Sequence, residues 1–236
     1  MAFWSHLRDK ITSLMTEHKG LPDTFKHTPL SACNWLAVDF EYSSLDVSTA
    51  KFMSAGWVEG NHTGIDIQSS YYRLIRAQGD LAQTPIIHGL TPRDIARGVH
   101  VRDMYEHICQ FATSHVWVVH NAQLDMGMLK ELSKRLQQPL PAIVCIDTMQ
   151  LALYQLYKKV DVIPKGGVIL SKCRERYELA NAPAHNALSD AMATLELWMA
   201  QMHSLDPSGC MTLNELKNTG AIKVFARHNE SEHELV

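Results

Sequence analysis

Cysteine is scarce in this chain of 236 residues, and the few cysteines follow no pattern. The five cysteines include no C-x-x-C pair, and their number is odd. These features argue against a structural zinc site and against a framework of disulfide bonds. The cysteine content therefore favours a reducing compartment such as the cytoplasm.

The sequence also lacks a long apolar segment. No apolar run approaches the roughly 18 to 20 residues that a membrane helix needs. The first twenty residues mix charged with apolar side chains, without the continuous core and small-residue cleavage site of a signal peptide. We expect neither a membrane span nor secretion, and thus a cytoplasmic protein.

No charge of one sign dominates the composition. The 22 Lys and Arg residues and 25 Asp and Glu residues leave a formal net charge of -3, which gives no global basic signal for nucleic acid. Residues 130–176 nevertheless contain nine Lys or Arg and four Asp or Glu. This local basic surplus fits a phosphate-binding surface, and it fits an ordinary solvated surface at least as well.

The length and hydrophobic content suit one α/β domain with appendages. We expect an N-terminal helical appendage and connector at residues 1–33, the domain at 34–204, and a partly flexible C-terminal extension at 205–236. Within the domain, turn residues separate apolar runs that predict strands at 35–42, 51–58 and 64–75. Helices and strands then alternate: helix 101–114, strand 116–120, helix 121–138, strand 142–148, and helices 149–157, 166–179 and 186–202. This order predicts a mixed sheet with helices packed on it.

The first predicted strand carries two acidic residues in an apolar run. Side chains alternate along a strand, so Asp39 and Glu41 share one face with Trp35 and Ala37. The opposite face is wholly apolar, which indicates a strand covered on both sides rather than an exposed edge strand. Two buried carboxylates side by side need a positive charge to neutralise them. A hard divalent cation can supply it, because such cations prefer carboxylate oxygens.

Two later segments add polar groups at the starts of predicted helices. Asp125 lies near the start of the helix after strand 116–120, where it could join a ligand site or only interact with the helix dipole. His185 precedes the last predicted helix and Asp190 lies one turn into it, so both can address one cavity. Alone, His185 fits a surface histidine better; the three segments together favour a shared site.

The combined motifs resemble a known family. "AVDFEYSSL", "VVHNAQLDMGML" and "HNALSDA" match in order the three exonuclease motifs of the DnaQ-like 3′–5′ exonucleases, the DEDDh branch of the ribonuclease H-like superfamily. "IIHGLTPRDI" and "CIDTMQLAL" are similar to that family's intermediate segments, and the resemblance covers about residues 34–203. It implies an α/β fold with a ribonuclease H-like mixed β-sheet, three antiparallel strands first and then parallel strands, flanked by helices.

The resemblance implies a role for each polar residue of the motifs. The metal-binding carboxylates would be Asp39, Glu41, Asp125 and Asp190, and the general base would be His185. Our hypothesis is that Asp39 bridges two Mg²⁺ or Mn²⁺ ions, that Glu41 and Asp190 complete the first site, and that Asp125 supports the second, largely through water. The resemblance also makes five residues candidates for substrate contact: Phe40, Tyr42, Ser43, His88 and Asn121.

The first motif departs from the family pattern. The common D-x-E-T-T-G appears here with Tyr42 and Ser44 in place of Thr and Gly. That turn approaches the terminal nucleotide in relatives, so activity is expected while substrate preference is open. Asn121 could contact a sugar or phosphate oxygen, or cap the helix that follows it.

The resemblance implies a metal-dependent 3′–5′ exonuclease acting on the 3′ ends of single-stranded DNA or RNA, with DNA favoured. The alternatives are a non-catalytic accessory module that binds nucleic acid or a polymerase, and an interaction domain with a structural cation site. A polymerase or other protein partner and a homodimer are both compatible with the sequence.

Overall fold

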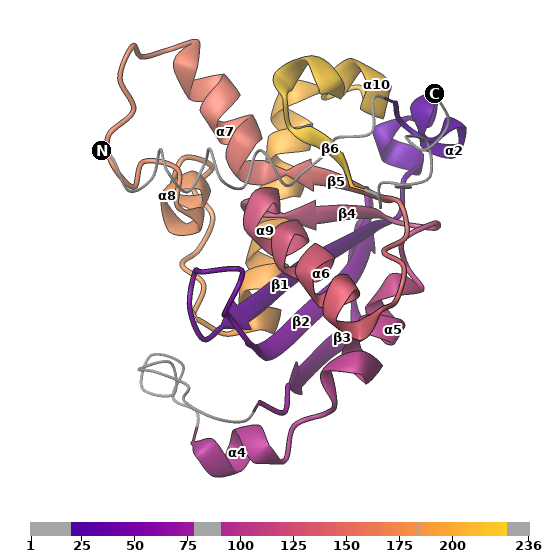
Figure 1. Cartoon of the computed structure of the whole chain (residues 1–236). Coiled ribbons are helices and arrows are strands. Elements are labelled where there is room, and N and C mark those ends of the chain that lie inside the picture. The colour runs from indigo at the N-terminus through magenta and orange to yellow at the C-terminus, as the bar shows by residue number, and fades with distance from the viewer. Residues whose placement is uncertain (1–19, 78–90, 184, 226–236) are drawn as a thin grey trace, which may run out of the picture.

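The computed structural model describes residues 20–77, 91–183 and 185–225, and these build one six-stranded sheet (Figure 1). Its strand order is β3-β2-β1-β4-β5-β6. The strands are β1 (Trp35–Tyr42), β2 (Phe52–Asn61), β3 (Gly64–Leu74), β4 (Val116–Val119), β5 (Ile143–Asp147) and β6 (Ile222–Phe225).

The sheet is mixed, as the sequence predicts. Strands β1, β2 and β3 pair antiparallel, and β4 and β5 then continue the sheet parallel to β1. The sixth strand, β6, pairs antiparallel with β5, and no sequence pattern had indicated it. Because parallel strands end at the same edge, β1, β4 and β5 present their carboxyl ends together.

Helices cover both faces of the sheet (Figure 1). On one face, Leu36 and Val38 pack with the apolar side chains of α5 and α6. On the other face, Trp35 and Ala37 pack with α9 and α10. The predicted burial of the first strand on both sides is therefore confirmed. The helices are α2 (Asp23–Lys26), α4 (Pro92–Ala96), α5 (Val101–Cys109), α6 (Ala122–Leu136), α7 (Thr148–Tyr157), α8 (Leu170–Glu175), α9 (Ala187–Leu205) and α10 (Leu213–Leu216).

Two helices are shorter than their sequence patterns predict. Helix α5 ends at Cys109 rather than at residue 114, and the chain continues in turns to strand β4. Helix α8 begins only at Leu170. Gly166 has a φ of 74°, a left-handed conformation that a right-handed helix does not contain, so the helix cannot begin there.

The two ends of the described chain pack against each other. Leu30, in the short 3-10 helix η1 (Leu30–Ala32), is fully buried and donates its N–H to the Met211 carbonyl at 2.8 Å. After α10, the 3-10 helix η2 (Lys217–Thr219) leads into β6. The C-terminal extension thus contributes a strand to the sheet. The division of the chain into three parts stays a prediction, and its calls for residues 1–19 and 226–236 lie outside the described residues.

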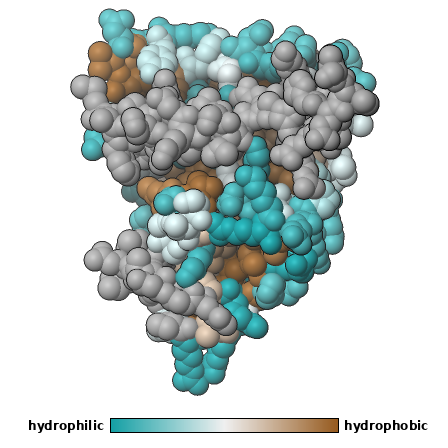
Figure 2. All heavy atoms as spheres, viewed as in Figure 1, coloured by the Kyte–Doolittle hydropathy of each residue, from teal (hydrophilic) through white to brown (hydrophobic). Residues whose placement is uncertain are grey.

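Apolar side chains remain exposed in the connection between α7 and α8. The exposed fractions of Val160 and Val162 are 42% and 80%. Figure 2 shows apolar surface at the upper left of the molecule, where this connection lies in the view of Figure 1. Among the described residues, no helix has both the length and the apolar character needed to cross a bilayer.

Candidate active site

Three carboxylates meet where β1 faces the start of α9. Asp39 and Glu41 lie on β1, and Asp190 lies in the first turn of α9. One carboxylate oxygen from each falls within a group whose members are all within 4.8 Å of one another. The structure thus brings together three of the four acids that the motifs single out.

A glycine in β2 allows α9 to approach this closely. Gly56 pairs with Asp39 in the sheet. A Cβ atom at Gly56 would lie 2.2 Å from the backbone nitrogen of Leu188 and 2.3 Å from the carbonyl carbon of Ala187. Any larger residue would push the first turn of α9 away, so Gly56 determines how near Asp190 lies to β1.

His185 precedes α9 and is held by the same carboxylate. Its φ of 66° is left-handed, which is unusual for a residue with a side chain. The His185 N–H donates to Asp190 Oδ2 at 2.9 Å, and the side chain of Asn186 caps α9 by accepting from the Ser189 N–H. The His185 side chain is solvent-exposed, and its charge lowers the pKa of Glu41. The histidine therefore faces the acidic group while staying open to water.

Asp125 reaches the site from the other face of the sheet. It lies in the first turn of α6, and 4% of it is exposed. The Tyr42 hydroxyl donates to Asp125 Oδ1 at 2.9 Å. Asp125 does not belong to the close group of three, yet its charge contributes to the raised pKa of Asp39. The fourth acid is thus adjacent to the group, restrained by a separate contact.

Burial raises the pKa of all four carboxyl groups, and repulsion from neighbouring carboxylates adds to this for Asp39, Glu41 and Asp125. Desolvation is the largest cause for each, and it raises the pKa of Glu41 to about 7 and that of Asp125 to about 7. The charge of Asp190 adds to the raised pKa of Glu41. A cluster of oxygen donors that repel one another fits a hard divalent cation such as Mg²⁺ or Mn²⁺.

We expect the metal-free protein to lose stability as the pH rises from 4.5 to about 7. Glu41 binds its proton more tightly in the folded chain, where its pKa is about 7, than at its ordinary value of 4.5. The free energy of unfolding should therefore fall as the pH rises from the ordinary pKa of 4.5 to above the raised pKa of about 7. Binding of a divalent cation should restore the lost stability. Thermal unfolding in chelator and in Mg²⁺ across this range measures both effects. Glu41→Gln should flatten the dependence, and a wild-type profile without this slope would contradict the prediction.

Asp147, at the end of β5, supports the site and was missed by the sequence analysis. Its carboxylate accepts the backbone N–H groups of Asn121 and Ala122 at the start of α6, and those of Met149 and Gln150 at the start of α7. One buried side chain thus caps two helices and positions the turn before Asp125. The sequence signal for this role was the acidic residue Asp147 at the boundary between a predicted strand and a predicted helix, where an N-cap is expected.

His120 is the neighbour of the motif residue Asn121, and its ring is used structurally. Burial lowers the pKa of His120 to about 4, so the ring is neutral. Nδ1 lies 2.8 Å from the Thr148 hydroxyl, and Nε2 lies 2.9 Å from the Val168 carbonyl oxygen. The ring therefore ties the end of β4 to the connection before α8.

The candidate substrate residues take different positions. Phe40 lies in the core, packed edge-on against Phe52 with ring centroids 5.3 Å apart. Asn121 begins α6 with a φ of 88° and makes no side-chain cap, so its predicted capping role is wrong. Ser43 exchanges hydrogen bonds with Lys51 across the loop after β1. His88 lies outside the described residues.

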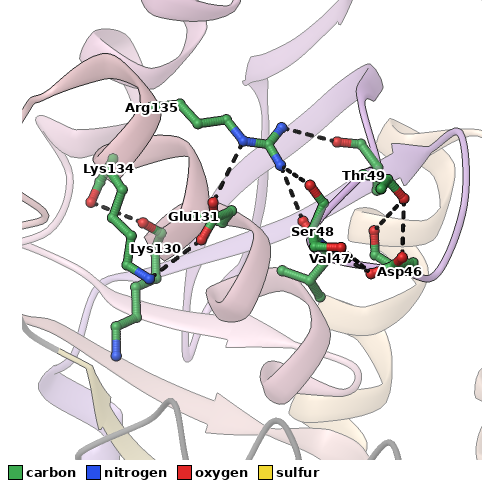
Figure 3. A network of polar contacts seen from close by, with 10 residues as sticks. Asp46, Val47, Ser48, Thr49, Lys130, Glu131, Lys134 and Arg135 are labelled. Atoms are coloured by element: carbon green, nitrogen blue, oxygen red, sulfur yellow. Dashed lines mark hydrogen bonds and ion pairs between the residues drawn. The ribbon is translucent and has the colours of Figure 1, made fainter.

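Arg135 of α6 anchors the loop between β1 and β2 (Figure 3). Its guanidinium donates to the carbonyl oxygens of Val47, Ser48 and Ala50, at 3.4, 2.6 and 3.3 Å. Inside the loop, the Asp46 carboxylate accepts the N–H and the hydroxyl of Ser48. Helix α6 therefore holds both Asp125 and the loop that follows Tyr42.

Replacing Arg135 by Ala should loosen this loop. The Arg135 side chain is 43% exposed, so in the variant water can form some of the hydrogen bonds that the guanidinium donates to the loop carbonyls. We therefore expect a loss of about 1 kcal/mol in the free energy of unfolding. Denaturant unfolding measures this change. Lys134→Ala, one position away with a 52% exposed side chain, is the matched control. Equal effects of the two substitutions would show that the loop contacts contribute nothing.

Several cations of the local basic surplus are engaged within the protein. Arg174 is buried and pairs with Glu196 at 2.6 Å, while its other donors reach the Ala193 and Ala180 carbonyls. Arg176 donates to the Gly167 carbonyl. The residues that could face a nucleic acid are thus mainly lysines, of which Lys134 and Lys172 pair with Glu131 and Glu175. The phosphate-binding interpretation of this region stays a prediction.

A family model described as RNase_T, exonuclease, matches residues 36–198. Among curated proteins, a Mycobacterium tuberculosis protein named for bifunctional exonuclease/endonuclease activity is 33% identical over 111 residues, which are 46% of this chain and 16% of that protein. A PolC-type DNA polymerase III of Caldanaerobacter subterraneus is 27% identical over 120 residues, which are 50% of this chain and 8% of the polymerase. The chain thus spans a small fraction of the length of these relatives.

Three solved nucleases have folds similar to this one. The structure of cell-death related nuclease 4 has a TM-score of 0.61 and 14% identity, over 86% of this chain and 83% of that one. Exonuclease X in complex with 5′ overhanging duplex DNA has a TM-score of 0.58 and 21% identity, over 79% and 99%. E. coli exonuclease I in complex with a dA16 oligonucleotide has a TM-score of 0.60 and 14% identity, over 75% and 42%. The likeness confirms the predicted ribonuclease H-like arrangement of the sheet and helices.

Proposed function

The chain belongs to the RNase_T exonuclease family, and from this premise we propose that it is a DEDDh-type 3′–5′ exonuclease that hydrolyses phosphodiester bonds at the 3′ end of single-stranded nucleic acid, with DNA favoured over RNA. The observation that carries the proposal is the group of Asp39, Glu41 and Asp190 within 4.8 Å, with His185 held beside it.

The four acids would hold two divalent cations, Mg²⁺ or Mn²⁺. Asp39 is central to the cluster, since the charges of Asp125, Glu41 and Asp190 all act on it, and it suits a shared ligand. Glu41 and Asp190 would complete the first site, and Asp125 would support the second. Such ions, when bound, ease the formation of a nucleophile from water and neutralise charge that builds on the phosphate.

His185 would accept the proton from the attacking water. Histidine suits this role because the unperturbed pKa of an imidazole lies near neutral pH. The hydrogen bond from the His185 N–H to Asp190 Oδ2 fixes the backbone from which the imidazole extends. The side chain is exposed to solvent, so water and substrate can reach it. Asp190 would therefore serve both as a cation ligand and as the group that positions the base.

The similar proteins support DNA as the substrate. Exonuclease X was solved with 5′ overhanging duplex DNA, and exonuclease I with dA16 and dT13 oligonucleotides, which favour a single strand. For this chain, the lysines of the local basic surplus would follow the strand, and Ser43 and Asn121 would lie near its terminal nucleotide. The polymerase relative and the exposed Val160 and Val162 support a polymerase or other protein partner.

Cleavage of 5′-labelled single-stranded DNA and RNA oligonucleotides, with Mg²⁺, Mn²⁺ or chelator, tests the proposal. We expect a metal-dependent ladder that shortens from the 3′ end and is stronger on DNA. An oligonucleotide blocked by a 3′-terminal modification and a circular single strand should both resist. Cleavage of the circle would overturn the exonuclease mode, and failure to cleave any polymer while metal is bound would favour a non-catalytic binding module.

A further inference from the structure

We propose that Tyr42 is a positioning residue whose hydroxyl orients Asp125 and thereby completes the second cation site. This inference rests on the proposed function, because it concerns the fourth carboxylate of the same site. It assigns a purpose to a residue at which the chain departs from the common D-x-E-T-T-G pattern.

The four acids do not come from one side of the sheet. Along β1 the side chains of Asp39 and Glu41 share the face of Trp35 and Ala37, and that face packs with α9. Asp190 approaches on this side. Asp125 comes from α6, which packs on the opposite face, and lies outside the close group of three. Asp125 must therefore reach the others around the end of β1, and a contact from outside that group restrains one of its oxygens.

Tyr42 is the β1 residue suited to supply that restraint. By alternation it points to the α6 face, and its hydroxyl donates to Asp125 Oδ1 at 2.9 Å. The pairing of β1 with β2 shifts register between Glu41 and Tyr42, where β2 has one extra residue, Met53, and Tyr42 therefore lies opposite Phe52. A threonine at this position would be too short to make the contact.

The phenol ring is itself held in place by aromatic packing. Tyr42 packs edge-on against Phe52, with ring centroids 5.2 Å apart, and Phe40 lies 6.2 Å away in a tilted arrangement. A ring fixed in this way holds its oxygen at a defined point. The bond does not exclude a cation, since a carboxylate has acceptor sites beyond the one that Tyr42 occupies. The arrangement is that of an outer residue that orients a metal ligand.

Tyr42→Phe tests the proposal because it removes the hydroxyl and keeps the ring packing. Mn²⁺ binding, measured by calorimetry and by electron paramagnetic resonance at a fixed alkaline pH without nucleic acid, should show two ions in the wild type. In Tyr42→Phe the tighter ion should bind as before, and the weaker one should lose about 10- to 100-fold in affinity. The Mn²⁺ concentration for half-maximal cleavage should rise accordingly, with most of the maximal rate recovered at saturation.

Two matched variants separate this inference from the proposed function. Asp125→Asn should lose the weaker ion, and Asp39→Asn should lose both. If Tyr42→Phe binds the second ion as the wild type does while Asp125→Asn loses it, the role of Tyr42 is overturned and the proposed function stands. If Asp39→Asn still binds both ions, the cation assignment of the proposed function fails instead. Equal weakening of both ions in Tyr42→Phe would indicate a general structural role and would also overturn the proposal.

Discussion

Replacement of Asp39 by Asn is expected to abolish exonuclease cleavage. Asp39 is the carboxylate on which the charges of the other three acids act, and it would be shared by both cations. The loss in kcat/KM should be at least the about 10²- to 10⁴-fold that removal of a catalytic base costs, because cation binding is lost as well. The measurement is the rate of shortening of a 5′-labelled single-stranded oligonucleotide at saturating Mn²⁺.

The stability of this variant distinguishes a lost site from a lost fold. Burial and three like charges raise the pKa of Asp39 well above its ordinary value, so the ionised carboxylate is unfavourable without metal. Metal-free Asp39→Asn should therefore unfold at or above the wild-type temperature at alkaline pH, although it is inactive. Asp66→Asn, an exposed acid on β3, is the control that should change neither property. Wild-type cleavage by Asp39→Asn would remove Asp39 from the mechanism.

Replacement of His185 by Asn is expected to lower the maximal rate about 10²- to 10⁴-fold while leaving Mn²⁺ binding unchanged. Asn is preferred to Ala here because His185 has a left-handed φ of 66°, which Asn adopts more readily than most residues. The backbone bond to Asp190 Oδ2 can therefore persist. The imidazole alone is removed, and with it the proposed acceptor for the proton of the attacking water.

Single-turnover cleavage rates and Mn²⁺ titrations of the same preparation measure the two halves of this prediction. His203→Asn, an exposed histidine near the other end of α9, should behave as the wild type. A variant that retains the full rate, or one that loses its cations, would show that His185 is not the base.

Much of the site follows from local sequence patterns. Alternation along β1 places Asp39 and Glu41 on one face, because the side-chain period of a strand is two residues. The positions of His185 and Asp190 at the start of a helix follow in the same way from the apolar pattern of α9. The apolar runs also predict five of the six strands, and the helix that carries Asp125.

Other parts of the site depend on contacts that no local pattern encodes. The bond between Tyr42 and Asp125 joins residues 83 positions apart. The carboxylate of Asp147 caps the start of α6 only because β4 and β5 are neighbours in the sheet. Strand β6 is four residues long and follows a short polar segment, so its apolar signal is weak until β5 provides a partner.

The sequence by itself determined the order of the elements, the family and the faces on which Asp39, Glu41 and Asp190 lie. The tertiary structure decided how closely α9 approaches at Gly56, how Asp125 arrives from the opposite face, and that Tyr42 rather than a shorter residue holds it. The physical reason is that periodicity sets the direction of a side chain within one element. Distances between elements arise from strand order, a bulge and the absence of a single Cβ atom.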